Sequence, residues 1–215
     1  MTITKIGHCC LLIKIASGNK MVTILTDPGN YSTGQDTLAG IDFLLITHEH
    51  ADHYHIESVK AILANNPEVK IITNSAVSKL LMKEKIAHSV IGHDQSSDLK
   101  GISLKGWGTK HAPIYKSVED VENTGYIIAD KLFYPGDAFT LLKCPIDILA
   151  LPVAGPWMKI SEAMDYALAV KPRKCFPVHD GNLRKYGVSH RLPKNELSKA
   201  GIEFIALEEG QTADF

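Results

Sequence analysis

The feature of the sequence that most constrains its fold is an apolar segment that runs directly into a cluster of metal-ligand side chains. Residues 43–47 read Phe-Leu-Leu-Ile-Thr, and residues 48–53 read His-Glu-His-Ala-Asp-His. The apolar run predicts a short buried strand, and open α/β sheets place their ligand sites beyond the carboxyl ends of such strands. The fold is therefore expected to hold a loop rich in ligand side chains at the edge of a buried sheet.

The spacing within this loop predicts two metal positions. His48 and His50 are two residues apart, so in extended backbone their side chains point the same way and can share one ion. Asp52 and His53 are adjacent and converge only where the chain turns into the following helix, which suits a second ion. Imidazole with carboxylate is typical of zinc, iron or manganese sites. The alternative is a solvated His-rich loop without a role, which its position at a strand end disfavours.

Segments of strand and helix alternate along the rest of the chain. Residues 9–15 and 21–26 predict a hairpin around Ser17-Gly18-Asn19. Further strands are expected at 70–73, 101–107, 124–129, 131–134, 146–151, 174–178 and 202–207. Helices are expected from Ile56 to the Asn65-Asn66-Pro67 stop, over 75–84, from a Ser161 cap to Lys171-Pro172, and from Pro193 to Gly201. Hairpins followed by crossover helices in each half predict an α/β fold of mixed sheets covered by helices.

Composition and length exclude several classes of protein. A chain of 215 residues without a Pro-, Gly- or Ser-rich linker is expected to form a single domain, residues 1–215. A formal net charge of −1 argues against a basic surface for nucleic acid or anionic membranes. No apolar run approaches about 18 residues, and no signal-peptide pattern is seen, which predicts a cytoplasmic protein. The four cysteines form no Cys-x-x-Cys pair, and Cys9 and Cys10 are expected to be buried and inert.

The His-x-His-x-Asp-His segment resembles the signature of the metallo-β-lactamase superfamily. The remaining motifs of that superfamily appear in the expected order, as Asp27 after an early strand, His111 in Gly-Thr-Lys-His-Ala, Asp137 in Tyr-Pro-Gly-Asp, and His179 in Phe-Pro-Val-His. The resemblance spans residues 7–182. It implies an αββα four-layer sandwich, in which two mixed sheets are covered by helices.

The resemblance also implies a ligand set for two divalent ions, with zinc expected first and manganese, iron or nickel as alternatives. The first metal position would be held by His48, His50 and His111, and the second by Asp52, His53 and His179. Asp137 would bridge the two ions. Asp52 could in addition orient the attacking hydroxide and take its proton, so Asp52 and Asp137 are the expected catalytic residues.

Three further residues are candidates for the surroundings of the metal ions. Asp27 is either a partner that fixes the tautomer of a ligand histidine or a turn residue before Pro28. His8, in Gly-His-Cys-Cys, resembles a segment of the small uncharacterised metal-dependent hydrolases and their ascorbate-phosphate lactonase-like relatives, where that histidine lies at the edge of the site. His190 lies just beyond the last motif and could reach a substrate.

The function implied by the resemblance is that of a hydrolase that uses a metal-bound hydroxide to cleave a small ester, lactone, amide or phosphodiester. A non-haem iron oxidoreductase of the same fold is an alternative. An RNA-processing nuclease is a second alternative, which the lack of net positive charge disfavours. A non-catalytic binding module is disfavoured because no expected ligand is missing. The expected partner is a small-molecule substrate, without membrane or nucleic acid, and the oligomeric state is not legible in the sequence.

Overall fold

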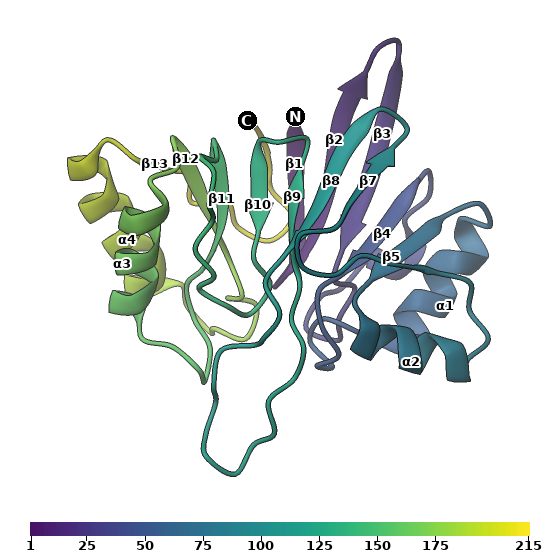
Figure 1. Cartoon of the computed structure of the whole chain (residues 1–215). Helices are drawn as coiled ribbons and strands as arrows, with labels where there is room; N and C mark the ends of the chain where they lie inside the picture. Colours follow the sequence, from purple (N-terminus) through teal and green to yellow (C-terminus); the bar gives the residue numbers. More distant parts are fainter.

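Two mixed β-sheets face each other and carry helices on their outer faces, as the computed structural model of residues 1–215 shows (Figure 1). The first half of the chain contributes the strands β1 Thr2–Gly7, β2 Cys10–Ser17, β3 Lys20–Thr26, β4 Phe43–Ile46, β5 Lys70–Thr73, β6 Ser89–Val90 and β7 Ser96–Leu99. The second half contributes β8 Ile102–Trp107, β9 Gly125–Ile128, β10 Leu132–Tyr134, β11 Ile148–Pro152, β12 Lys174–Val178, β13 Glu203–Phe204 and β14 Thr212–Asp214. The α-helices are α1 Ile56–Asn65, α2 Ser75–Lys83, α3 Ile160–Val170 and α4 Gly187–Leu197, with 3₁₀ turns η1 Gln35–Thr37 and η2 Ser198–Ala200.

The two sheets are built by the same rule. The first has the order β14-β1-β2-β3-β4-β5-β6 and the second β13-β12-β11-β10-β9-β8-β7. In each sheet the strands that follow short turns pair antiparallel, and the later strands pair parallel. Parallel pairing requires a crossover. Helices α1, α2, α3 and α4 lie in four of these crossovers, whereas the β3–β4 and β10–β11 connections contain no α-helix. The predicted order of hairpins before crossover helices is confirmed in both halves.

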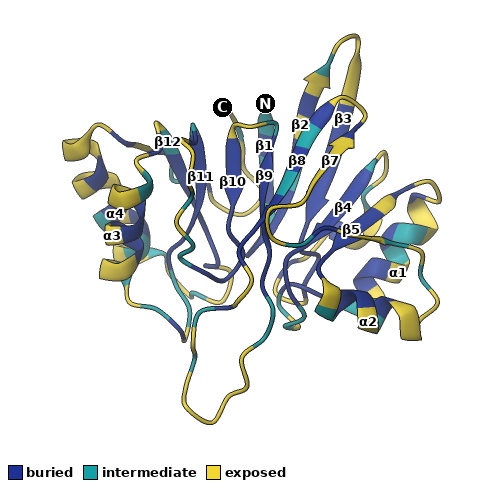
Figure 2. Cartoon of the chain, in the orientation of Figure 1, coloured by how far each residue is buried: buried dark blue, intermediate teal, exposed yellow.

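Three apolar clusters separate the four layers. The largest lies between the sheets and takes alternate residues of β2, Leu11, Ile13 and Ile15, as the two-residue period of a strand requires. The opposite face of β2, including Cys10, packs against α1 and α2. A third cluster lies between the second sheet and α3 and α4. Each helix is buried on its inner side and exposed on its outer side (Figure 2). The predicted αββα sandwich is therefore confirmed.

The cysteines fit this layered core. Cys9, Cys10 and Cys175 are buried and Cys144 is exposed. Burial raises the pKa of Cys9 and of Cys175 to about 12, so both thiols stay protonated near neutral pH. The predicted burial of Cys9 and Cys10 is confirmed.

Two helix starts differ from their predictions. Helix α3 begins at Ile160 and not after a Ser161 cap, because the Lys159 backbone N–H donates to the Glu162 carboxylate. Helix α4 begins at Gly187, so Pro193 lies in its interior and not at its first turn. A proline is tolerated there at the loss of one helical hydrogen bond. No helix of this structure is long and apolar enough to cross a membrane.

Candidate metal centre

The predicted site residues come together where strands from both sheets end. Asp27 follows β3, residues 47–53 follow β4, and His179 follows β12. Asp137 lies three residues beyond β10, and His111 comes from the long β8–β9 segment, residues 108–124, that runs past the sheets (Figure 1). The site therefore lies across the line between the two sheets and takes side chains from both.

His48, His50 and His111 form the first group of side chains. One ring nitrogen of each lies within 4.8 Å of the others, and His48 Nε2 is 3.2 Å from His50 Nδ1. His48 and His111 are buried, while His50 is partly exposed. The structure thus brings together the three residues expected at the first metal position, with one side open to solvent.

The hydrogen bonds of these histidines fix their tautomers. The Thr47 hydroxyl donates to Asp27 and so accepts from His48 Nδ1–H. His111 Nδ1–H donates to the carbonyl oxygen of Ala112. A neutral imidazole with its proton on Nδ1 has a free lone pair on Nε2. Both rings therefore present an Nε2 lone pair to the group, as metal ligands must.

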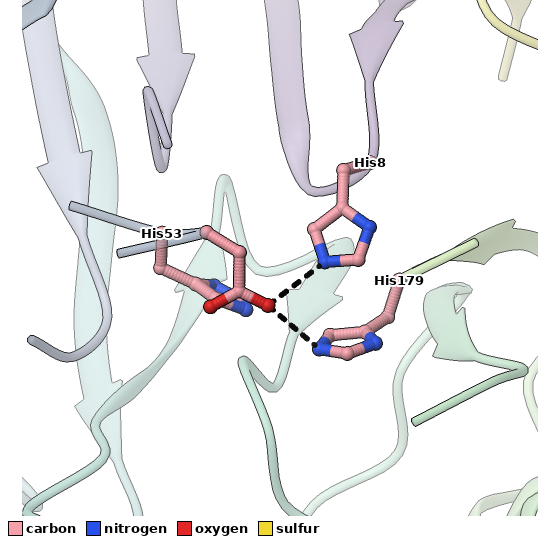
Figure 3. A group of neighbouring side chains, drawn as sticks. His8, His53 and His179 are labelled. Carbon is pink, nitrogen blue, oxygen red and sulfur yellow. Dashed lines mark hydrogen bonds and ion pairs between the residues drawn. The ribbon is translucent and has the colours of Figure 1, made fainter. Parts of the chain in front are cut away.

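His53, His179, Asp52 and His8 form the second group, again with ligand atoms within 4.8 Å of one another. His8 Nε2 and His179 Nε2 approach the same oxygen of Asp52, at 3.2 and 3.6 Å (Figure 3). Three members of this group, Asp52, His53 and His179, are those expected at the second metal position. His8, which was expected at the edge of the site, lies within the group itself.

Asp137 lies between the two groups. Its Oδ1 is 3.1 Å from His53 Nε2, and its Oδ2 is 2.8 Å from His179 Nε2. The same Oδ2 is 3.3 Å from His111 Nε2, so one carboxylate touches ligand atoms of both groups. This is the placement that a bridging carboxylate needs.

Several buried atoms of the centre have no hydrogen-bond partner despite these short distances. They are His53 Nε2, Asp137 Oδ1 and both ring nitrogens of His179. Buried polar atoms without a partner are rare because each costs roughly 1–3 kcal/mol. Neighbouring imidazole nitrogens and a carboxylate oxygen that are left without a protein partner are an arrangement that a metal ion completes, so the donor set fits metal binding.

The carboxylates of the centre are ionised. Burial alone would raise the pKa of Asp137, but the adjacent imidazoles of His53 and His179 outweigh burial and hold that pKa well below its usual range. The pKa of Asp52 falls to about 2 although burial opposes the shift, because His8 hydrogen-bonds it and His53 lies nearby. Both side chains are therefore anionic near neutral pH, which suits cation binding.

Asp27 is buried behind His53 and accepts four hydrogen bonds. Its Oδ2 accepts from His53 Nδ1–H at 2.7 Å, from the Tyr134 hydroxyl at 2.6 Å and from the Thr47 hydroxyl at 2.7 Å. Its Oδ1 accepts from the Thr47 backbone N–H. The structure thus places Asp27 as the partner that fixes the tautomer of His53, and His53 Nε2 is left free for the centre.

The backbone around the site is strained. Asp27, His8 and His179 have φ values of 35°, 36° and 62°, a region that residues other than glycine occupy at a cost. Asp27 also precedes Pro28, which disfavours compact backbone at that position. At Gly29 a Cβ atom would lie 1.8 Å from the carbonyl oxygen of Asp52, so only glycine allows this close approach of the two loops.

A family model for the beta-lactamase superfamily domain matches residues 2–179. The chain belongs to this family. It is 33% identical to protein Rv0786c of Mycobacterium tuberculosis over 184 residues, which cover 83% of this chain and 84% of that protein. It is 27% identical to a UPF0173 metal-dependent hydrolase of Thermococcus onnurineus, over 73% of this chain and 76% of that protein. The crystal structure of a protein from Parabacteroides distasonis superposes with a TM-score of 0.75 at 24% identity, over 97% of this chain and 93% of that one.

Within this beta-lactamase superfamily domain, one contact of the centre and one contact beside it were not visible in the sequence. The Trp157 Nε1–H donates to Asp137 Oδ2 at 2.9 Å. His190, which could reach a substrate according to the sequence, is buried and donates to Asp180 Oδ2 at 2.6 Å. The two contacts join residues 20 and 10 positions apart, which no helix or strand spacing brings together, so no local motif signals them.

Proposed function

We propose that the protein is a metal-dependent hydrolase that acts on a small ester, lactone, amide or phosphodiester. The observation that carries this proposal is that the single carboxylate of Asp137 lies within 3.3 Å of ring nitrogens from both groups of histidines. The curated relative from Thermococcus onnurineus, named a metal-dependent hydrolase, supports it. The finer likeness to ascorbate-phosphate lactonase-like proteins stays a prediction.

We propose two divalent ions, zinc first, held at the two metal positions defined above, with Asp137 between them. Nitrogen and carboxylate donors suit zinc, and also manganese, iron or nickel. When bound, such ions supply a water molecule of lowered pKa and polarise the substrate oxygen.

The side chains of the protein have separate tasks in this proposal. Asp52 is ionised and its side chain is 21% exposed, so its carboxylate can accept a proton from water. Trp157 holds the Asp137 carboxylate by its Nε1–H. Beside His50 and His111, a small hollow is lined by Pro113, Ile114 and other residues of the β8–β9 segment.

We further propose that residues 1–215 work as one domain. The first metal position combines His48 and His50 of the first sheet with His111 of the β8–β9 segment, and the second combines His53 with His179 of the second sheet. Neither half of the chain carries a full set of ligands. Both sheets must therefore stay together for the site to exist.

A substrate panel tests the proposed function. The metal-free protein, reconstituted separately with zinc, manganese, nickel or iron, is assayed on lactones, carboxylic esters, thioesters and phosphodiesters. We expect turnover of at least one class that depends on added metal and is lost with a chelator. Oxygen uptake by the iron form without any hydrolysis would contradict the proposal and favour the oxidoreductase alternative.

A further inference from the structure

The hydrogen bonds of His8 run opposite to those of the candidate ligand histidines. In His48, His53 and His111 the Nδ1 atom donates to an oxygen atom, so a neutral ring keeps its Nε2 lone pair for the centre. In His8 the backbone N–H of Gly181 donates to Nδ1 over 3.0 Å, so a neutral ring must carry its proton on Nε2. That Nε2–H points at Asp52 Oδ2, 3.2 Å away (Figure 3).

This tautomer is incompatible with metal binding through Nε2. To bind an ion there, His8 would have to move its proton to Nδ1, where it would face the Gly181 N–H. Two donors would then oppose each other in a site where His8 is fully buried, and leaving a buried donor unsatisfied is costly. Although His8 lies within ligand distance of Asp52, His53 and His179, its surroundings favour a donor.

The Gly181 N–H is held in place by close packing of two loops. The His179 backbone N–H donates to the His8 carbonyl oxygen at 3.1 Å. A Cβ atom on Gly181 would lie 2.8 Å from His8 Cβ, closer than real contacts allow. The turn at residues 179–181 is thus fitted against the loop between β1 and β2, and glycine is required for the fit.

A buried ion pair between Lys5 and Asp180, with its hydrogen-bond partners, holds the turn at residues 179–181 in place. The Lys5 ammonium, on β1, donates to the Asp180 carboxylate and to the carbonyl oxygens of Pro177 and Leu207. The second oxygen of Asp180 accepts from His190 on α4. Lys5 and Asp180 are both buried, and each polar atom involved is paired. The network therefore fixes the residue between His179 and Gly181 without touching the centre itself.

We propose that His8 is a positioning residue for Asp52. The Gly181 backbone N–H fixes His8 as an Nε2–H donor. His8 thereby holds one oxygen of the Asp52 carboxylate toward the second metal position. His8 is not itself a ligand. This inference rests on the proposed two-metal hydrolase.

The protonation of the ring can be read directly by nuclear magnetic resonance. Long-range ¹H–¹⁵N spectra of histidine-labelled protein are recorded without metal and after loading with zinc, and the His8 signals are assigned from their absence in His8→Gln. We expect Nε2 to carry the proton in both states, with Nδ1 unprotonated. A zinc-bound Nε2 or a proton on Nδ1 would overturn the proposal.

Two substitutions separate the donor from the ring. The side-chain amide of His8→Gln can reach the place of Nε2 and donate to Asp52, whereas the shorter His8→Asn reaches only the place of Nδ1. Outer partners of ligands typically change metal affinity by about 10–100-fold. We expect His8→Asn to weaken the lower-affinity zinc site at least about tenfold, and His8→Gln to stay within about threefold of wild type.

The controls make failure of this inference distinct from failure of the proposed function. His88→Asn, at a histidine paired only with Ser78 and Ile86, should leave zinc affinity unchanged. Equal zinc affinities for His8→Gln and His8→Asn would contradict the positioning role. If wild type itself binds no zinc, the proposed function fails, while the spectra of the metal-free protein still decide the tautomer of His8. Those spectra also decide the proposal if the asparagine variant does not fold.

Discussion

Replacing Asp137 by alanine is expected to reduce metal-dependent hydrolysis at least about 100-fold, beyond the effect typical of an outer ligand partner. Asp137 is the only carboxylate that touches ligand atoms of both groups, through His53, His179 and His111. Without it the metal positions share no ligand and the histidines lose their common counter-charge. Turnover of the best substrate from the panel, with zinc in excess, is the measurement.

The same variant should remain folded. Its free energy of unfolding without metal is expected to fall by no more than about 3 kcal/mol, the upper range of ordinary substitutions. Asp147→Ala serves as the matched control, because Asp147 pairs with Arg173 at the surface and contacts no site residue. An active Asp137→Ala variant, or equal losses of activity in both variants, would rule out the bridging role.

Replacing Asp27 by asparagine is expected to lower zinc affinity about 10–100-fold, as the loss of a tautomer-fixing partner does in other metal sites. If the new amide keeps its oxygen on the Thr47 N–H, its NH₂ group faces His53 Nδ1. His53 must then accept there and carry its proton on Nε2, which removes the lone pair from the second metal position. Asparagine tolerates the left-handed backbone of this position, so the change isolates the carboxylate.

The substitution should also destabilise the protein, by about 2–4 kcal/mol, because a donor replaces an acceptor among buried donors, including the Tyr134 hydroxyl. Calorimetric zinc titration and chemical unfolding measure the two effects. Asp42→Asn, at a partly exposed aspartate that pairs with Lys100, is the control and should leave zinc affinity unchanged. Unchanged affinity in Asp27→Asn would show that Asp27 is only a turn residue.

The fold and the candidate ligands could be predicted because their signals are local. Residues 48–53 are contiguous, and His111, Asp137 and His179 each follow a strand in a fixed order. The partners of these residues could not be predicted, because they depend on how distant strands pack. Tyr134 meets Asp27 across 107 residues, and Lys5 meets Asp180 across 175. No single-chain pattern encodes such contacts.

A short strand at the edge of the first sheet was not predicted from the sequence, for a related reason. Strand β14 has three residues and pairs only with β1, so its identity depends on its neighbour more than on its own sequence. The sequence likewise predicts the start of α4 at Pro193, whereas the helix begins at Gly187. The residues before Pro193 include His190, whose contact with Asp180 is not visible in a helix pattern. Tertiary contacts, not local propensity, set both elements.

Metal stoichiometry is the most direct test of the central claim. The metal-free protein is titrated with zinc, and bound metal per chain is determined after removal of the excess, together with the unfolding temperature. We expect about two zinc ions per chain and a higher unfolding temperature for the loaded protein, because ligands that bind only the folded state stabilise it. Binding of no zinc, with an unchanged unfolding temperature, would contradict the account of a two-metal centre.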